Sequence, residues 1–363
     1  MITEKGEIVC SLAPTSIEGQ PTNPRNSEGD FIHTTDGRIL FIYSRFEGET
    51  GGDDANADIA CIESCDEGFT WSAPRILFRA KDLGMKNIMS VTLRRMQNGD
   101  IGLFYFYRLY DHNAKYVLYR SADEGATWSE PVYCIDIPGY YVINNDRVLQ
   151  HSSGRLIIPS AFHPPMPAAD NHFAMSFIAA NRFFISDDDG RTWKPTPDMP
   201  ALNCNHTSTG LQEPGLVELS NGVIWAYART DLGRQYEYFS VDGGMSWTPP
   251  QPSAFTSPCS PMLIKRNPYD NKLYAVWNPA PVYPGRDDLP GSWGRTPLVL
   301  AVSDDEGRTW SKPLILEDDE ERGFCYPALH FGPDYLLLGY CAGGLADGIC
   351  LCRTDIRRIS VKY

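Results

Sequence analysis

Arginine side chains are the groups in this sequence whose chemistry is the easiest to define. A guanidinium group is always charged, and it binds a carboxylate through two parallel hydrogen bonds. The 363-residue chain has a formal net charge of −14 at pH 7, so a cluster of arginines would form a cationic site on an acidic background. Such a site suits a small anionic ligand, whereas the acidic chain as a whole argues against nucleic acid as a partner.

A second polar group occupies the segment Asn144–Arg147, ahead of the turn at Ser153-Gly154. Amide and carboxylate side chains in such a segment can contact a ligand, and they can equally hydrogen-bond their own backbone in a turn. Asn145 and Asp146 are therefore candidate substrate-binding residues, and the sequence leaves the turn interpretation open.

An internal repeat indicates the elements that must position these side chains. The motif S-x-D-x-G-x-[ST]-W occurs five times, and its aspartates are Asp66, Asp123, Asp188, Asp242 and Asp305. In a tight turn the aspartate can accept hydrogen bonds from backbone N–H groups, the glycine can adopt positive φ, and the tryptophan can cover the neighbouring sheet. Because an apolar run precedes each copy, the motif predicts a strand, a turn and a second strand.

Further turn signals between the motifs predict additional strands. Each precedes an apolar run, and they are Asp36-Gly37, Asn98-Gly99, Ser153-Gly154 and Asn221-Gly222. Together the two kinds of signal give about four strands per repeat, which is the composition of a β-propeller blade. We therefore expect residues 1–363 to form a single all-β domain, a six-bladed β-propeller whose last blade is closed by both termini. Five blades is the competing count.

Composition supports many short strands and offers no sign of a membrane or metal partner. Aromatic residues make up 12% of the chain, and its 31 Gly and 28 Pro suit tight turns. No apolar stretch is long enough for a signal peptide or a membrane span, so the sequence predicts a cytoplasmic protein without a membrane partner. The ten cysteines contain no C-x-x-C pair, which favours reduced thiols over a metal site.

The repeated motif resembles the Asp box, or BNR repeat, of the sialidase (neuraminidase) superfamily, and the resemblance extends over nearly the whole chain. Asp boxes also occur in non-catalytic propellers, so activity has to be argued from a site. The resemblance implies a retaining glycosidase in which three arginines hold the substrate carboxylate. It also implies a tyrosine nucleophile paired with a glutamate base, an aspartate as general acid and base, and no requirement for a metal or cofactor.

The resemblance assigns roles to individual residues. Arg25 stands where the family has its first arginine, although the usual Arg-Ile-Pro does not appear. Asp53 lies in the loop before the first Asp-box strand, where the family has its acid/base aspartate, and Asp54 is the second choice. Glu213 resembles the glutamate base that precedes a strand, and Arg229 resembles the second arginine at the end of the following strand.

Two further residues complete the set that the resemblance implies. Arg295 precedes the strand of the last Asp box, as the third arginine does in the family. Tyr326 stands in the place of the nucleophile, with Pro327 where a small polar residue is common. The order Arg, Asp, Glu, Arg, Arg, Tyr along the chain suggests that these side chains converge.

The resulting hypothesis is an exo-glycosidase that releases terminal sialic acid, or a related 2-keto acid sugar, from glycoconjugates. Two alternatives remain open on the sequence. One is a hydrolase or lyase that acts on another acidic sugar, and the other is a carbohydrate-binding propeller without catalytic activity.

Overall fold

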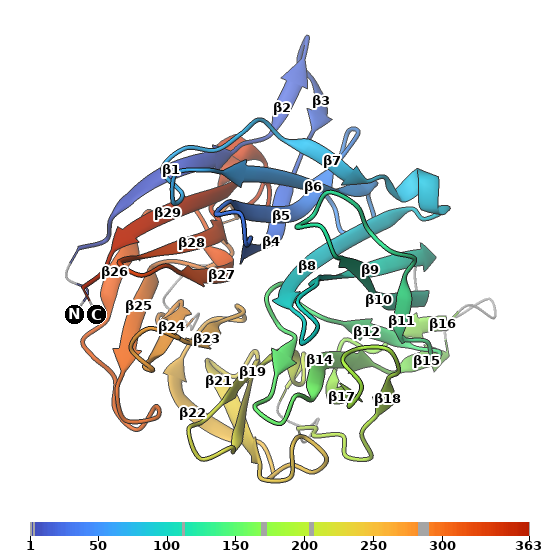
Figure 1. The fold of residues 1–363 in the computed structure, drawn as a ribbon, viewed down its shortest axis with the longest axis vertical. Helices are drawn as coiled ribbons and strands as arrows, with labels where there is room; N and C mark the ends of the chain where they lie inside the picture. Colours follow the sequence, from blue (N-terminus) through green and yellow to red (C-terminus); the bar gives the residue numbers. More distant parts are fainter. Residues whose placement is uncertain are drawn as a thin grey trace.

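The computed structural model describes residues 2, 4–110, 113–167, 173–202, 207–281 and 290–362 of the chain. Antiparallel sheets follow one another around a central axis, and the chain passes round this ring from its N-terminus to its C-terminus (Figure 1). Apart from two short 3-10 helices, Ala80–Leu83 and Leu345–Asp347, the described elements are β-strands. The structure confirms the prediction of an all-β propeller. None of the described helices has the length and apolar character needed to span a membrane.

An eight-stranded sheet occupies the first third of the ring. Its strands are β4 (Asn26–His33), β5 (Ile39–Phe46), β6 (Ala57–Ser64), β7 (Arg75–Phe78), β8 (Asn87–Arg95), β9 (Ile101–Tyr110), β10 (Asn113–Ser121) and β11 (Val132–Ile135). The sheet consists of two antiparallel meanders, β4 to β7 and β8 to β11. A single parallel pairing, Ala57 with Asn87, joins them.

Three sheets follow along the chain. The first contains β12 (Tyr140–Val142), β13 (Leu149–Gln150), β14 (Leu156–His163), β17 (Ala180–Ser186) and β18 (Lys194–Pro195). The second contains β19 (Gln212–Glu218), β20 (Ile224–Arg229), β21 (Arg234–Ser240) and β22 (Gln251–Thr256). The third contains β23 (Leu263–Arg266), β24 (Leu273–Trp277), β25 (Leu298–Ser303) and β26 (Leu314–Glu317). Two short hairpins accompany the ring, β2 (Thr15–Ile17) with β3 (Gln20–Asn23) and β15 (Pro165–Pro167) with β16 (Phe173–Met175).

Both ends of the chain meet in the sheet that closes the ring. This sheet contains β27 (Cys325–Phe331), β28 (Tyr335–Cys341), β29 (Thr354–Ser360) and, from the other end of the chain, β1 (Glu7–Leu12). Strand β1 pairs antiparallel with β29, and the two termini lie side by side in Figure 1. The predicted closure by both termini is therefore present.

Each Asp box folds as the turn of a hairpin, as the sequence predicted. In the first copy the Ser64 hydroxyl donates to the Asp66 carboxylate at 2.8 Å, and the same carboxylate accepts from the backbone N–H of Thr70 at 2.9 Å. The indole N–H of Trp71 donates to the Gly68 carbonyl at 3.1 Å. The other four copies repeat the serine-to-aspartate hydrogen bond at 2.8 Å. These bonds stay within one short motif, so the local sequence determines each turn.

The apolar core is divided into layers between neighbouring sheets. In one layer Phe104 and Tyr116, from the β8 to β11 meander, pack with Leu156 of the next sheet. In another layer Leu300 of β25 belongs to the same cluster as Leu338 of β28. The sheets are thus packed face to face, and close packing restricts movement of the inner strands that carry the site.

Four inner strands each contain a bulge, and each bulge turns one side chain out of the regular pleat. The pairing register shifts in β4, β8, β19 and β27. Within these bulges one residue per strand adopts positive φ: Glu28 (56°), Ser90 (62°), Glu213 (44°) and Tyr326 (53°). A bulge re-aims a side chain, and positive φ is unfavourable for residues other than glycine. Because the same unfavourable conformation recurs at these four positions, they are candidates for a functional site.

Candidate active site

The four bulge residues Glu28, Ser90, Glu213 and Tyr326 line one small cavity, here called the Tyr326 cavity. Its volume is about 50 Å³, and the rest of its lining consists of Asp53, Met89, Phe106, Arg108, Tyr140, Val142 and Ile143. The lining residues come from both ends of the chain and from its middle. Only closure of the ring brings them together.

Tyr326 and Glu213 form the central contact of this cavity. The Tyr326 hydroxyl donates a hydrogen bond to Oε1 of Glu213 at 3.0 Å. Burial and the Glu213 carboxylate raise the pKa of Tyr326 well above its usual value, although Arg229 and Arg295 act in the opposite direction. The phenol is therefore neutral at pH 7, and it needs a base to become a nucleophile. Glu213 is placed to be that base.

Two arginines predicted from the sequence surround this pair. Arg229 lies 3.0 Å from Oε2 of Glu213, and its guanidinium also donates to the Gln212 side chain at 2.7 Å. The guanidinium carbon of Arg295 lies 5.7 Å from the centre of the Tyr326 ring. Both cations lie close to Tyr326, so their charges can stabilise an anionic ligand group that contacts this side chain.

Arg25, the third predicted arginine, contacts two carboxylates of the cavity lining. Its guanidinium lies 3.0 Å from Glu28 and 2.6 Å from Asp53. Burial disfavours ionisation of Asp53, but the charge and hydrogen bond of Arg25 outweigh it, so the pKa of Asp53 is below its usual value. The Asp53 side chain remains 63% exposed. Asp54 is also exposed, and the structure places it outside the cavity lining.

Asn145 and Asp146 are adjacent in sequence, but only the Asn145 side chain hydrogen-bonds to a residue that lines the Tyr326 cavity. The Asn145 amide donates to the backbone carbonyls of Gly29 at 2.8 Å and Tyr326 at 3.2 Å, and so links two bulges. Asp146 is fully buried, and Lys265 binds it at 2.7 Å. It lines a different and larger cavity. The structure therefore brings Asn145, and not Asp146, together with the other candidate residues.

Most residues of the Tyr326 cavity were not predicted from the sequence, and Glu28, Arg108 and Tyr140 are the ionisable ones among them. Burial raises the pKa of Glu28 to about 7, and the nearby carboxylates Asp53 and Glu213 add to this, while Arg25 opposes it. Arg108 donates to the Tyr140 hydroxyl and to the backbone carbonyl of Asp53. A local signal for Glu28 does exist, because Glu28 comes one residue before Gly29 and Glu213 comes two residues before Gly215.

The arrangement is rich in cations and has no metal centre in the described part of the chain. Four arginines, Arg25, Arg108, Arg229 and Arg295, contact the lining residues. Among described residues, no group of three or more His, Cys, Asp or Glu side chains could hold a metal ion. The chemistry available from these side chains is anion binding, nucleophilic attack and proton transfer.

The fold and the site together define a class of protein, an all-β propeller built on Asp-box hairpins with a tyrosine–glutamate pair among arginines. The sequence model of the BNR repeat-like domain matches residues 37–338. The chain belongs to this family, within the sialidase superfamily.

Individual relatives agree with this membership. A sialidase of Bacteroides fragilis is 26% identical over 233 residues, covering 60% of this chain and 38% of the relative. The chain thus spans about two fifths of the length of that curated relative. A solved protein of unknown function from Dyadobacter fermentans has a TM-score of 0.73 at 18% identity, covering 99% of this chain and 100% of the other. A mutant of NanB sialidase from Streptococcus pneumoniae has a TM-score of 0.70 at 12% identity, covering 98% and 71%. The structural similarities establish the propeller fold.

Proposed function

We propose that this protein is a glycoside hydrolase of the sialidase type, which releases terminal sialic acid or a related 2-keto acid sugar from glycoconjugates. The observation that carries the proposal is the hydrogen bond from Tyr326 to Glu213, which lies in a cavity surrounded by arginines. An anionic sugar repels a carboxylate nucleophile. A neutral tyrosine with a glutamate base avoids this repulsion, and it is the arrangement that sialidases use.

In the proposed first step, Arg25, Arg229 and Arg295 bind the substrate carboxylate. Glu213 takes the proton of Tyr326 while the phenolic oxygen attacks the anomeric carbon. The bond to the leaving-group oxygen breaks, and Asp53 donates a proton to that oxygen. The product of this step is a covalent tyrosyl glycoside and a free aglycone.

In the proposed second step, Asp53 accepts a proton from a water molecule that attacks the same carbon. The bond to Tyr326 breaks, and the phenolate recovers its proton from Glu213. Two displacements at one carbon retain its configuration. Asn145 acts as a positioning residue, because its amide holds the Tyr326 backbone against the neighbouring inner strand.

Substrate entry requires a change at the Asp53 loop. The Tyr326 cavity has a volume of about 50 Å³, whereas ligand pockets usually measure ~300–1,000 Å³. Asp53 is the exposed part of the lining, and its ion pair with Arg25 occupies the guanidinium that would bind a substrate carboxylate. We infer that substrate displaces Asp53 from Arg25, which also brings Asp53 closer to its ordinary pKa and so to a proton-donating role.

We also propose that the propeller has six blades. The two meanders of the eight-stranded sheet meet at one parallel pairing and not through a continuous ladder. Divided at this pairing, the eight-stranded sheet gives two blades. The three sheets that follow it and the closing sheet give four more, which supports the count of six. Five Asp boxes are compatible with this count, because the sheet closed by both termini does not contain one.

Another acidic sugar is the second candidate substrate, and one contact favours it. Glu28 lies 3.0 Å from Arg25 and occupies part of the guanidinium. When Glu28 is ionised it competes with a substrate carboxylate, so the position of the acidic group can differ from that in sialic acid. Hydrolysis and elimination are both compatible with such a substrate.

Release of 4-methylumbelliferone from its α-N-acetylneuraminide tests the main proposal. A parallel assay with a 4-methylumbelliferyl uronide tests the second candidate, and ultraviolet absorbance of the sugar product detects elimination. Turnover of the neuraminide with the α-anomer as first product, observed by proton NMR, supports the proposed mechanism. Turnover of the uronide alone would indicate that the substrate is another acidic sugar. Binding of both compounds without turnover would indicate a carbohydrate-binding propeller.

A further inference from the structure

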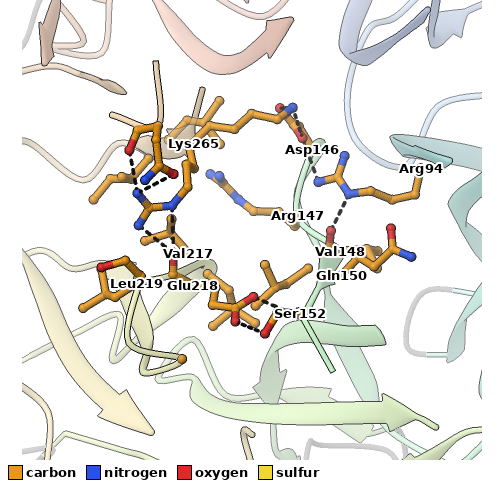
Figure 2. Close-up of a pocket in the computed structure, with 18 residues that line it drawn as sticks. Arg94, Asp146, Arg147, Val148, Gln150, Ser152, Val217, Glu218, Leu219 and Lys265 are labelled. Atoms are coloured by element: carbon orange, nitrogen blue, oxygen red, sulfur yellow. Dashed lines mark hydrogen bonds and ion pairs between the residues drawn. The ribbon is translucent and has the colours of Figure 1, made fainter. Parts of the chain in front are cut away.

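A second and larger cavity lies at the opposite end of strand β19. Its volume is about 660 Å³, and its lining includes residues 146–150, 216–220 and 263–266 (Figure 2). Glu213 of the Tyr326 cavity and Glu218 of this second cavity are both on β19, and the strand between them is roughly 16 Å long at about 3.3 Å per residue. The two cavities are therefore separate sites.

Cationic side chains outnumber carboxylates in the lining of the second cavity. The four cations are Arg94, Arg147, Lys265 and Arg266. Arg94 and Lys265 share one carboxylate, Asp146, at 3.0 and 2.7 Å, and Figure 2 shows Asp146 between them. Arg266 has its own partner, Glu306, at 2.6 Å. The other lining carboxylate, Glu218, contacts Ser152 and His151 and none of these cations. Two cations on one carboxylate leave positive charge in excess.

Arg147 increases this excess, because no described carboxylate pairs with it. Its guanidinium donates to the Met262 carbonyl at 2.6 Å and to the Tyr227 hydroxyl at 3.5 Å. Within the described chain its Nε has no hydrogen-bond partner, and the residue is only 2% exposed. Figure 2 shows Arg147 among the lining side chains, between Lys265 and Val148. A buried cation without a counterion is unfavourable, so this position has unused capacity for an anion.

Asp30 does not fully supply the missing negative charge. It lies 3.5 Å from Arg94. Burial, and the neighbouring carboxylate of Asp146, raise the pKa of Asp30 to about 7. Its carboxyl group is therefore only partly ionised at neutral pH, so Asp146, Glu218, Glu306 and Asp30 together do not fully neutralise the four cations.

We propose that the second cavity binds a small organic oxyanion of about monosaccharide size. Arg147 binds the anionic group, and Lys265 adds positive potential to the same region. Gln150 and Asn271 line the cavity and offer hydrogen bonds to hydroxyl groups. A volume of about 660 Å³ lies inside the usual range for small-molecule sites, ~300–1,000 Å³. This site shares no residue with the Tyr326 cavity, so it does not depend on the proposed hydrolase activity.

Isothermal titration calorimetry of the full chain tests the proposal with three anions and one neutral control. N-acetylneuraminate carries a carboxylate, glucose 6-phosphate carries a phosphate ester, and inorganic phosphate is the oxyanion alone. Glucose is the neutral control. We expect at least one sugar anion to bind, more tightly than inorganic phosphate, and glucose not to bind. The preferred anion then distinguishes carboxylate from phosphate recognition.

Two variants assign the binding to the second cavity. Ser220→Trp fills part of the cavity without removing a charge, because the Ser220 side chain is exposed and lines it. Arg147→Met removes the unpaired cation. We expect Arg147→Met to weaken binding at least about tenfold, the loss that follows from one charge-assisted hydrogen bond. We expect Ser220→Trp to weaken binding to a similar extent, because the indole occupies space that the anion needs. If Arg147→Met does not fold, Ser220→Trp still decides the question.

Arg229→Met separates the two sites, because it removes a cation beside Glu213 of the Tyr326 cavity and no residue that lines the second cavity. We expect it to bind the preferred anion as the wild type does. The proposal is overturned if no anion binds to the wild type, or if Ser220→Trp binds normally. It is also overturned if Arg229→Met alone loses binding, because the anion would then occupy the Tyr326 cavity.

Discussion

The hydroxyl of Tyr326 donates a hydrogen bond to the carboxylate of Glu213 at 3.0 Å, although the two residues are 113 positions apart in sequence. Both adopt positive φ in a bulge of an inner strand, Glu213 at 44° and Tyr326 at 53°. The contact therefore depends on two unfavourable backbone conformations and on the closed ring that holds them face to face. These conformations reduce local stability and so indicate a functional role, which is the reason to test this pair first.

Replacing the phenolic oxygen should abolish turnover without abolishing the fold. We expect Tyr326→Phe to lower kcat for the neuraminide by at least about 10³-fold, as removal of a covalent nucleophile does in other enzymes. Binding of substrate should remain, because the arginines are unchanged. The matched control is Tyr141→Phe, which removes a buried hydroxyl that donates to the Pro138 carbonyl at 3.4 Å. Equal losses in the two variants would contradict a specific role for Tyr326.

The role of Glu213 as the base can be tested against a control carboxylate on the same sheet. We expect Glu213→Gln to lower kcat by about 10²- to 10⁴-fold, which is the range for loss of a general base. Glu237→Gln is the matched control, since Glu237 is a half-buried carboxylate on β21 that does not line the Tyr326 cavity. Steady-state kinetics of both variants provide the measurement. Activity of Glu213→Gln within a few fold of the wild type would exclude it as the base.

The acid can be identified by its dependence on the leaving group. A good leaving group such as 4-methylumbelliferone needs little protonation, whereas a sugar alcohol needs a proton to depart. We expect Asp53→Asn to lose much more activity on a sialylated disaccharide than on the aryl glycoside. Asp54→Asn should change activity on the two substrates by the same factor, because Asp54 lies outside the cavity lining. The opposite pattern in the two variants would assign the acid to Asp54.

Glu28 should make stability fall as pH rises. Its pKa is raised from 4.5 to about 7 in the folded protein, so the folded state holds a proton that the unfolded state releases. The stabilisation is present below pH 4.5 and is lost as pH rises through 7. We expect the wild type to lose up to about 3 kcal/mol more than Glu28→Gln between pH 4.5 and 8.

Urea unfolding at several pH values measures this difference. Glu130→Gln is the control, because it removes an equal charge from an exposed position, and it should follow the wild type. Parallel pH dependence of the wild type and Glu28→Gln would show that Glu28 ionises normally. Asp30 contributes a similar dependence in all three proteins, so only the differences between them are interpreted.

The sequence by itself determined the Asp-box hairpins and, through their repetition, the class of fold. Every hydrogen bond that shapes such a turn stays inside one short motif, as between Ser64, Asp66 and Thr70, so local chemistry was sufficient. The order of arginine, acid and tyrosine residues also suggested that these side chains converge. Tyr326, Glu213, Asp53 and the three arginines do lie together, as that order predicted.

Only the tertiary structure decided which neighbours of these residues face the Tyr326 cavity. Asn145 and Asp146 are adjacent in sequence, yet one contacts the Tyr326 backbone and the other lines the second cavity. Glu28 joined the site through a bulge in β4 whose register shift cannot be read from residue types alone. In a strand the side chains alternate between faces, and one extra residue reverses that alternation. The direction of each side chain therefore depends on strand pairing, which forms only when distant parts of the ring assemble.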